Sequence, residues 1–350
     1  MDFSEALTSK GPIVIAEIGT NHNQDIEEAE FLIQAAAEAG CQFVKFQIYE
    51  PYEIVNPLLE ATEYGWDNAF GVATAWEAFD RFLKTPKSWF PRLAEFTRDH
   101  GIGWGVTVHG DNGIQWATDA GPDFVKIASM DHSNLPLIES VGKTFSVPVL
   151  ISLGMANYED VLRIGDLLPQ FHGQVVLLHC SSLYPPRVDE LRMSNIPPLR
   201  DLLGVRVGYS DHTVGVETAA EAASLGARVF EKHVTRHTEQ VGPDHEFAIP
   251  VSELGAYVHR LNEVEVVKDS ISSREFLELS PREEAARSRF LKSIHVTHDL
   301  RAGQRISKAS LYCARPGVGI PPRFLPGLAG KTLSRSIPAH TPIQWSDLAE

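Results

Sequence analysis

"VRVGYSDHT" (residues 205–213) and "RVFEKHVT" (228–235) are two apolar runs that each carry an acid and a histidine near their end. Between them lies "VETAAEAASLGA" (216–227), whose alanine-rich pattern predicts a helix with a glycine near its C-terminus. A strand, a helix and a second strand in this order predict a βαβ unit with parallel strands. Repetition of this unit would decide the fold.

The same unit recurs along the preceding part of the chain. Six further short apolar runs alternate with amphipathic helical patterns: "IVIAEIG" (13–19), "FVKFQIY" (43–49), "WGVTVH" (104–109), "FVKIAS" (124–129), "VPVLIS" (147–152) and "VVLLHC" (175–180). Continuously apolar strands are typical of a parallel sheet that is buried on both faces. Eight units within residues 1–270 predict an α/β fold of the (β/α)8 barrel type. An open doubly wound sheet is the alternative, but a glycine-rich phosphate loop is missing.

The remainder of the chain predicts a linker and a second domain. Residues 271–288, "ISSREFLELSPREEAARS", are charged and polar, and we interpret them as the linker. Within residues 289–350, "DLRAGQRISKASL" (299–311) aligns with "SIPAHTPIQWSDL" (336–348) as a faint repeat. Short strands, turns rich in proline and glycine, and this repeat predict a small, mostly β module.

Composition excludes several classes of partner. The 350 residues carry a formal net charge of -15, which argues against nucleic acid and anionic membranes as partners. A small anionic substrate remains possible, because a cleft can be locally basic. No apolar run approaches the ~20 residues that a membrane helix needs, and the first residues do not resemble a signal peptide. Three widely spaced cysteines favour a reduced, cytoplasmic location.

Polar side chains end nearly every predicted strand, where barrel enzymes build their active sites. They are Glu17, Lys45, Gln47, Thr107, His109, Lys126, Ser129, Ser152, His179, Asp211, His212, Glu231 and His233. One such residue alone, for example His109, is more often structural than catalytic. The complete ring is the informative signal, and it predicts a site at this end of the barrel.

Two pairs within this ring indicate specific chemistry. His212 and His233 end adjacent strands, so their imidazoles can converge on a divalent metal ion; hydrogen bonding to the backbone is the alternative. Lys45 and Lys126 lie in apolar strands and must point into the cleft or remain as costly buried charges. Converging cations favour a phosphate or carboxylate ligand. A Schiff-base lysine at position 126 is the rival interpretation.

Motifs spread over almost the whole chain, in order, resemble one family. They are "IAEIGTNHNQD", "VKFQIY", "VKIASMDHSNLPLI", "LISLGMA", "LLHCSSLYPP", "GYSDHTVG", "FEKHVT" and "GPDH". Together they resemble the sialic acid synthases, which include N-acetylneuraminate, pseudaminate and legionaminate synthases. "VTHDLRAGQRISKASLYCARPGVGIPP" resembles the antifreeze-like (SAF) domain that ends chains of this family.

The resemblance implies a reaction and its site. The family condenses phosphoenolpyruvate with an N-acetylated hexose-type sugar aldehyde and releases phosphate, giving a nine-carbon α-keto acid. It implies that His212 and His233 hold a manganese or magnesium ion that polarises the aldehyde. Residues that match phosphoenolpyruvate- or sugar-binding positions are Lys45, Gln47, Thr107, Lys126, Ser129, Ser152, Ser182, Tyr184, Ser210 and Asp244. Glu17, Lys126 and Asp131 match catalytic positions, although Asp131 stands where a longer glutamate is usual.

The resemblance also implies a domain-swapped homodimer. Arg315 opens "RPG", a motif in which the family's arginine reaches the sugar site of the partner's barrel. Residues 50–88 depart from the family pattern, are rich in aromatics, and follow the second strand, so we expect them near the sugar. The sugar itself stays open between N-acetylmannosamine, its 6-phosphate and a diacetamido-trideoxyhexose. A metal-dependent barrel aldolase or hydrolase, and a non-enzymatic SAF-containing binding protein, are the alternative functions.

Overall fold

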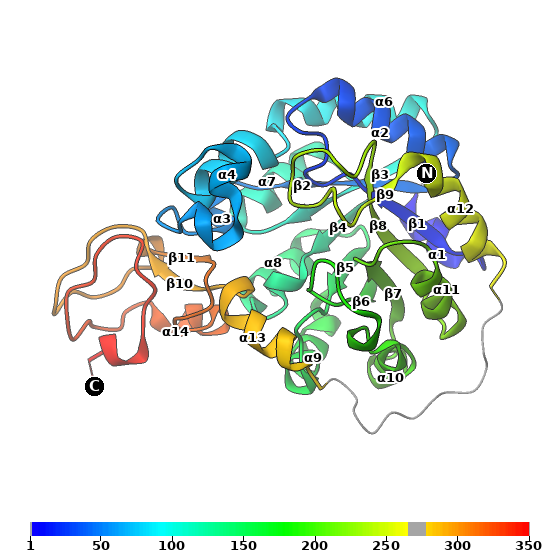
Figure 1. Ribbon diagram of the computed structural model, residues 1–350. Coiled ribbons are helices and arrows are strands. Elements are labelled where there is room, and N and C mark those ends of the chain that lie inside the picture. Colours follow the sequence, from blue (N-terminus) through cyan, green and yellow to red (C-terminus); the bar gives the residue numbers. More distant parts are fainter. Residues whose placement is uncertain (1, 265–277, 350) are drawn as a thin grey trace.

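The computed structural model of the protein describes residues 2–264 and 278–349, and it contains a closed barrel of eight parallel strands (Figure 1). Each strand pairs with the next along the chain, and the pairing of the first with the eighth closes the sheet. The strands are β1 (Ile13–Glu17), β2 (Phe43–Ile48), β3 (Gly103–Val108), β4 (Phe124–Ile127), β5 (Val149–Ser152), β6 (Val175–His179), β7 (Arg206–Asp211) and β8 (Val229–Thr235). The predicted barrel is confirmed, and the alternative of an open doubly wound sheet is wrong.

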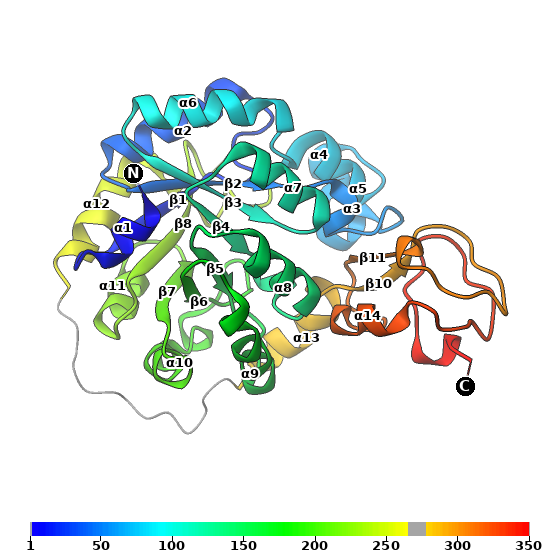
Figure 2. The ribbon, with the colours of Figure 1, turned by 180° about the vertical axis from the view of Figure 1, so that it is seen from behind.

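Helices cover the outside of the barrel on all sides (Figure 2). They are α2 (Ile26–Glu38), α6 (Phe90–Asp99), α7 (Asp111–Ala120), α8 (Leu135–Thr144), α9 (Tyr158–Leu167), α10 (Ile196–Leu203), α11 (Glu217–Ser224) and α12 (Val251–Asn262). A further helix, α1 (Phe3–Thr8), closes the N-terminal end of the barrel. The Phe3 ring lies 4.6 Å from that of Phe43 and 4.5 Å from that of Phe124, so an aromatic plug seals this end.

Strands β7 and β8 divide their polar residues between two faces. Successive side chains of a strand point to opposite sides, so Glu231 and His233 of β8 face the barrel mouth. Lys232, between them, points outward and lies 3.0 Å from Asp211 of β7, with both side chains fully buried. The sequence analysis placed Asp211 in the ring of polar residues at the strand ends. In the structure it instead neutralises the buried Lys232 beneath α12.

The C-terminal part is built around a small antiparallel sheet of β10 (Ser293–Val296) and β11 (Leu311–Ala314). The aligned positions of the sequence repeat, Leu300 and Ile337, exchange both backbone hydrogen bonds, at 2.9 and 2.8 Å. Their side chains are buried in one apolar cluster with Ile306 and Ile343. The repeat thus forms two arms that pair across a shared core, as expected for a mostly β module.

Part of the predicted linker is a helix. Residues 271–277 lie outside the described residues, but α13 (Pro281–Phe290) occupies most of the rest of the segment and extends beyond it. Ser280 caps this helix in a capping box with Glu283. Arg287 of α13 donates a 2.7 Å hydrogen bond to the carbonyl oxygen of Met155, at the barrel rim. The polar composition of the segment therefore reflects a short helix. This helix lies between the barrel and the small C-terminal sheet, and it docks on the barrel (Figure 1).

The loops after β2 and β8 complete the rim. The first carries α3 (Pro51–Ile54), α4 (Trp66–Phe70) and α5 (Ala75–Ala78), and the second leads to β9 (Ile249–Pro250). α14 (Leu325–Leu328) lies in the C-terminal part.

None of the helices in the described ranges is long and apolar enough to cross a membrane. All three cysteines are free thiols; the cytoplasmic location stays a prediction.

Candidate active site

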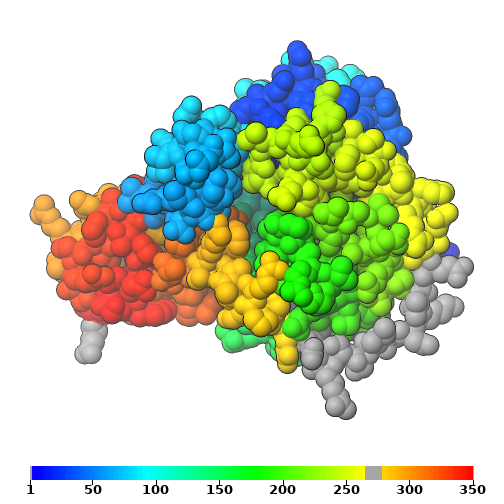
Figure 3. Space-filling view, in the orientation of Figure 1, coloured from blue at the N-terminus to red at the C-terminus, as the bar shows by residue number. Residues whose placement is uncertain are grey.

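A cavity of about 410 Å³ opens at the C-terminal ends of the strands. Figure 3 shows this face hollowed where the blue segment after β2, the orange helix α13 and the green loops after β6 and β8 meet. Eleven of the predicted site residues line the cavity: Glu17, Lys45, Gln47, Thr107, Lys126, Ser129, Ser152, Tyr184, Ser210, Asp244 and Arg315. His212 and His233 line it as well, so the cavity brings together residues from most of the strands.

The floor of the cavity is a cluster of two lysines and two carboxylates. Lys45 Nζ lies 2.6 Å from Glu17 Oε2 and 3.6 Å from Glu231 Oε2, and it donates a 2.7 Å hydrogen bond to Thr107 Oγ1. Lys126 Nζ donates to Glu231 Oε1. All four charged side chains are at least nine-tenths buried, and their charges cancel.

Electrostatics keep this cluster ionised around Glu231. Burial alone raises the pKa of Glu231, but the ammonium groups of Lys126 and Lys45 outweigh burial and hold the pKa below its usual value. Burial lowers the pKa of Lys45, yet Glu17 and Glu231 raise it further, and the net shift is upward. The pKa of Glu17 is raised, chiefly by burial. An anionic ligand entering the cavity meets two lysines that are each paired with a buried carboxylate.

The two predicted metal ligands lie side by side at the wall. The ring centroids of His212 and His233 are 5.6 Å apart. His212 Nδ1 is bonded to the carbonyl oxygen of Ser181 at 2.8 Å, which leaves Nε2 facing the cavity, 3.4 Å from Ser210 Oγ. Burial lowers the pKa of His212 to about 4 and that of His233 well below its usual value. Both imidazoles are therefore neutral at physiological pH, the form in which histidine binds a metal.

Asp244 and Tyr184 flank the histidine pair. Asp244 Oδ2 lies 3.6 Å from His233 Nδ1 and accepts a 3.1 Å hydrogen bond from Thr20. Burial raises the pKa of this carboxyl to about 6. The Tyr184 ring packs on His212 with centroids 4.4 Å apart. These contacts fix the orientation of both imidazoles.

The segment after β2 supplies an aromatic wall, as the sequence predicts. Tyr64, Trp66 and Phe79 line the cavity. The Tyr64 and Trp66 rings stack at 4.6 Å, and the Trp66 ring meets that of Phe79 edge-on at 5.4 Å. The segment has its own apolar core, so the wall is rigid. It offers a ligand an apolar face opposite the charged floor.

Arg315, at the end of β11, lines the cavity of its own chain. Its backbone N–H donates to the carbonyl oxygen of Ile54, and the N–H of Asn56 donates to the carbonyl oxygen of Arg315, both at 3.1 Å. Its guanidinium lies 5.4 Å from the centre of the Phe290 ring. The structure of one chain thus supplies the arginine in cis, which differs from the predicted action in a partner's barrel.

Two predicted site residues do not line the cavity. Ser182 is buried behind Ser129 and donates a 2.8 Å hydrogen bond to its hydroxyl. Asp131 is fully buried, and the ring of His109 lines the cavity in its place. The aspartate is therefore not a residue that contacts substrate; it accepts a 2.9 Å hydrogen bond from His109 Nδ1.

Among the cavity residues that sequence reasoning did not assign to the site, two carry titratable groups at strand ends, Glu231 and His109. Both were noted at strand ends, and the period-two alternation could have placed each with a recognised partner. Glu231 lies two residues before His233, and His109 two residues after Thr107. Residues at this spacing share a strand face, so the signal for both was present.

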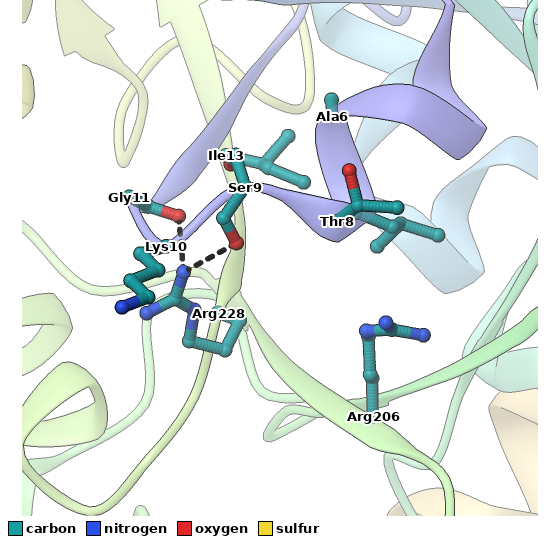
Figure 4. Close-up of a pocket in the computed structure, with 9 residues that line it drawn as sticks. Ala6, Thr8, Ser9, Lys10, Gly11, Ile13, Arg206 and Arg228 are labelled. Atoms are coloured by element: carbon teal, nitrogen blue, oxygen red, sulfur yellow. Dashed lines mark hydrogen bonds between the residues drawn. The ribbon is translucent and has the colours of Figure 1, made fainter.

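A second cavity, of about 270 Å³, lies at the opposite end of the barrel. Figure 4 shows Arg228 donating to the carbonyl oxygens of Ser9 and Gly11, which ties the end of α1 to β8. Lys10 and Arg206 also line this cavity. It belongs to the N-terminal end, which in such barrels serves stability and not chemistry.

A barrel with paired lysines and a histidine pair at its strand ends is the framework of an enzyme that handles an anionic substrate. The chain belongs to the NeuB family, whose model matches residues 32–272. The SAF domain model matches residues 292–349. The resemblance drawn from the motifs is therefore confirmed.

The similarity to individual relatives covers nearly the whole chain. It is 32% identical to the N,N'-diacetyllegionaminic acid synthase of Legionella pneumophila, over 96% of this chain and 94% of that protein. It is 27% identical to the pseudaminic acid synthase of Helicobacter pylori, over 96% and 98%. The crystal structure of the spore coat polysaccharide biosynthesis protein SpsE from Bacillus subtilis is similar, with a TM-score of 0.81 and 26% identity over 97% and 96% of the two chains.

Proposed function

We propose that this protein is a nonulosonate synthase, which condenses phosphoenolpyruvate with an N-acetylated hexose-type sugar aldehyde and water. The products are a nine-carbon α-keto acid and phosphate. The observation that carries the proposal is the convergence of Lys45 and Lys126 on Glu231 beside two neutral histidines in one cavity. The names of the relatives from Legionella and Helicobacter, a legionaminic and a pseudaminic acid synthase, agree with it.

The cationic floor fits phosphoenolpyruvate. Its phosphate and carboxylate need several cationic and hydroxyl donors, and charge-assisted hydrogen bonds are the strongest that the site can offer. Lys45 and Lys126 supply the charge, and the hydroxyls of Thr107, Ser152 and Ser210 line the same cavity. Ser152 Oγ is buried without a hydrogen-bond partner among the described residues. Its hydroxyl group can therefore donate a hydrogen bond to a ligand.

The histidine pair fits a divalent metal ion. His233 Nδ1 is buried and has no hydrogen-bond partner in the described ranges, and His212 presents Nε2 to the same space. These residues would hold Mn²⁺ or Mg²⁺, which when bound supplies a Lewis acid for the aldehyde oxygen. Within residues 2–264 and 278–349, no group of three or more His, Cys, Asp or Glu could hold a metal. Water and substrate oxygens would therefore complete the coordination.

The rival role of Lys126 as a Schiff-base nucleophile has less support. A Schiff base forms from the neutral amine. Lys126 Nζ donates to the Glu231 carboxylate inside the protein, so it is already engaged as a hydrogen-bond donor. A metal-dependent barrel hydrolase, as a second rival, would use the histidine pair but not two buried lysines.

The direct test measures phosphate released from phosphoenolpyruvate with Mn²⁺ or Mg²⁺ and each of a panel of N-acetylated aldoses. The proposed function expects release that depends on both the metal and one or more sugars of the panel. Phosphate release without any sugar would indicate a hydrolase. No release with any sugar would favour an aldolase or a non-enzymatic SAF-containing binding protein.

The aromatic wall predicts how the sugar is bound. Replacing Trp66 by alanine removes an apolar face, which is worth about 1–2 kcal/mol and corresponds to a roughly 5- to 30-fold rise in KM for the sugar. The KM for phosphoenolpyruvate is expected to stay constant, because the lysine floor is untouched. Phe82→Ala is the matched control, since Phe82 stacks on Phe70 and does not line the cavity. An equal rise in both KM values contradicts the assignment.

We also propose a homodimer that exchanges C-terminal domains, so that Arg315 acts in the partner's barrel. The docking contacts of Arg315, with Ile54 and Asn56, would be the same whichever chain supplied the barrel. The prediction is tested by mixing Arg315→Ala with His212→Ala chains. In trans, each mixed dimer contains one barrel with an intact histidine pair and an intact arginine, and activity returns to up to about half of the sites. In cis, as in the single chain, no recovery occurs.

A further inference from the structure

A buried chain of three residues runs from the C-terminal domain into the cavity. Lys292, just before β10, lies 2.6 Å from Asp131 Oδ1, and Asp131 Oδ2 lies 2.9 Å from His109 Nδ1. Lys292 Nζ also donates a 3.1 Å hydrogen bond to the carbonyl oxygen of His109. The side chains of Lys292 and Asp131 are fully buried. Of the three residues, only His109 lines the cavity.

The position of His109 follows from the strand. Thr107 is the last residue but one of β3 and faces the lysine floor, where it accepts the hydrogen bond from Lys45. His109 is two residues further along, so it shares that face and lies nearer the cavity mouth. The edge of the Tyr49 ring contacts it at 5.7 Å between centroids. The imidazole is therefore held in one orientation between an aromatic ring and a carboxylate.

The hydrogen bonds select one tautomer. Burial raises the pKa of Asp131, but Lys292 and His109 outweigh it and hold the pKa below its usual value, so the side chain is a carboxylate. A carboxylate only accepts hydrogen bonds, so His109 Nδ1 carries the proton. The free nitrogen, Nε2, is buried and has no hydrogen-bond partner in the described part of the chain. An unpartnered acceptor of this kind on a cavity wall is available to a ligand or water.

Burial is the main reason that the ring is neutral. Burial lowers the pKa of His109 to about 4, Asp131 raises it, and Lys292 and Arg315 lower it. Above this pH the ring can accept a proton, and Asp131 stabilises the imidazolium that forms, as in other His–Asp pairs. Both cations, Lys292 and Arg315, come from the C-terminal part of the chain, so docking of that part shapes the properties of the imidazole.

We propose that His109 is the general base of the reaction, and that Asp131 and Lys292 are its positioning residues. This inference rests on the proposed synthase function. As the C2–C3 double bond of phosphoenolpyruvate opens and C3 bonds to the aldehyde carbon, His109 Nε2 takes a proton from the water whose oxygen bonds to C2. The C2–O bond to phosphate then breaks, the hydroxyl at C2 becomes the keto group, and the imidazolium returns its proton to the leaving phosphate. The second proton of the water is transferred to the oxygen of the former aldehyde, so atoms and charges balance.

The kinetic test compares His109→Ala, His109→Gln and Asp131→Asn with wild type, and His259→Ala serves as a control on an exposed helix position. Loss of a general base lowers kcat by about 10²- to 10⁴-fold. KM for phosphoenolpyruvate is expected to stay within about twofold, because its proposed ligands remain. Free imidazole is expected to restore part of the activity of His109→Ala, which has space for it, but not that of His109→Gln. Wild-type kcat in His109→Ala, or a loss of kcat that imidazole does not restore, overturns the assignment.

A second measurement does not depend on the sugar. Nitrogen NMR of ¹⁵N-histidine-labelled protein, assigned by the missing signal of His109→Gln, is expected to show a protonated Nδ1 and a bare Nε2 at His109. In Asp131→Asn the amide can donate to Nδ1, and the proton moves to Nε2. A protonated Nε2 in the wild type overturns the proposal even if no sugar of the panel reacts. Conversely, an inactive wild type with the expected tautomer contradicts the synthase function and leaves the His109–Asp131 pairing in place.

Discussion

His212→Ala is expected to lower synthase activity by at least about 10²- to 10³-fold. The two imidazoles are neutral and lie side by side in the cavity wall, with ring centroids 5.6 Å apart. A Lewis acid at a carbonyl oxygen contributes several kcal/mol to the transition state, and each 1.36 kcal/mol is tenfold in rate. The fold is expected to persist, because His212 lies at the barrel mouth, where its main contact is with the Ser181 backbone.

Chelation gives the same prediction without a mutation. Removal of divalent ions from the wild type is expected to abolish activity, and addition of Mn²⁺ or Mg²⁺ is expected to restore it. The metal content of each protein, measured by elemental analysis, is expected to fall in His212→Ala and to stay unchanged in His259→Ala, whose side chain is exposed on α12. Full activity of His212→Ala in the presence of chelator refutes the metal assignment.

The barrel could be predicted from sequence because its determinants are local. Each strand is a short apolar run, each helix has a polar face, and the strand ends are marked by residues such as Lys45 and Lys126 that have no place in an apolar core. The alternation of β8 then separates Glu231 and His233 from Lys232. This rule needs no knowledge of tertiary contacts, and it accounts for the part of the cavity lining that the strands supply.

The misassigned residues depend on contacts that are distant in sequence. Asp131 was assigned to a catalytic position, but its short side chain is engaged by Lys292, which no local pattern connects to it. His109 looked structural as a single histidine, and only its contact with Asp131 gives it a free Nε2 in the cavity. The helix α13 is different: Ser280, Pro281 and Glu283 were a readable capping signal, but the polar composition favoured a linker.

Glu231→Gln is expected to destabilise the protein by about 3–5 kcal/mol, the usual cost of leaving a buried ion without its partner. Glu231 joins Lys45 and Lys126, and its side chain is 1% exposed. Without its charge the floor has two ammonium groups and only Glu17 to balance them. Unfolding in urea, followed by circular dichroism, measures the change. Glu139→Gln is the matched control, because its pair with Lys143 is about half exposed and is worth only about 0.3–0.5 kcal/mol.

The difference in unfolding free energy between wild type and Glu231→Gln is expected to depend on pH in one direction. Because the folded pKa of Glu231 lies below its ordinary value of 4.5, the stability that its charge provides is complete above that pH. It is lost only as the pH falls through the folded pKa. The gap in unfolding free energy between wild type and Glu231→Gln is therefore expected to be constant above about pH 5.5 and to narrow in acid. A phosphate-bearing anion at saturating concentration is expected to narrow it at neutral pH too, because the anion replaces the missing charge beside both lysines. If the difference in unfolding free energy widens in acid, or does not change when the anion is added, Glu231 does not set the charge balance of this site.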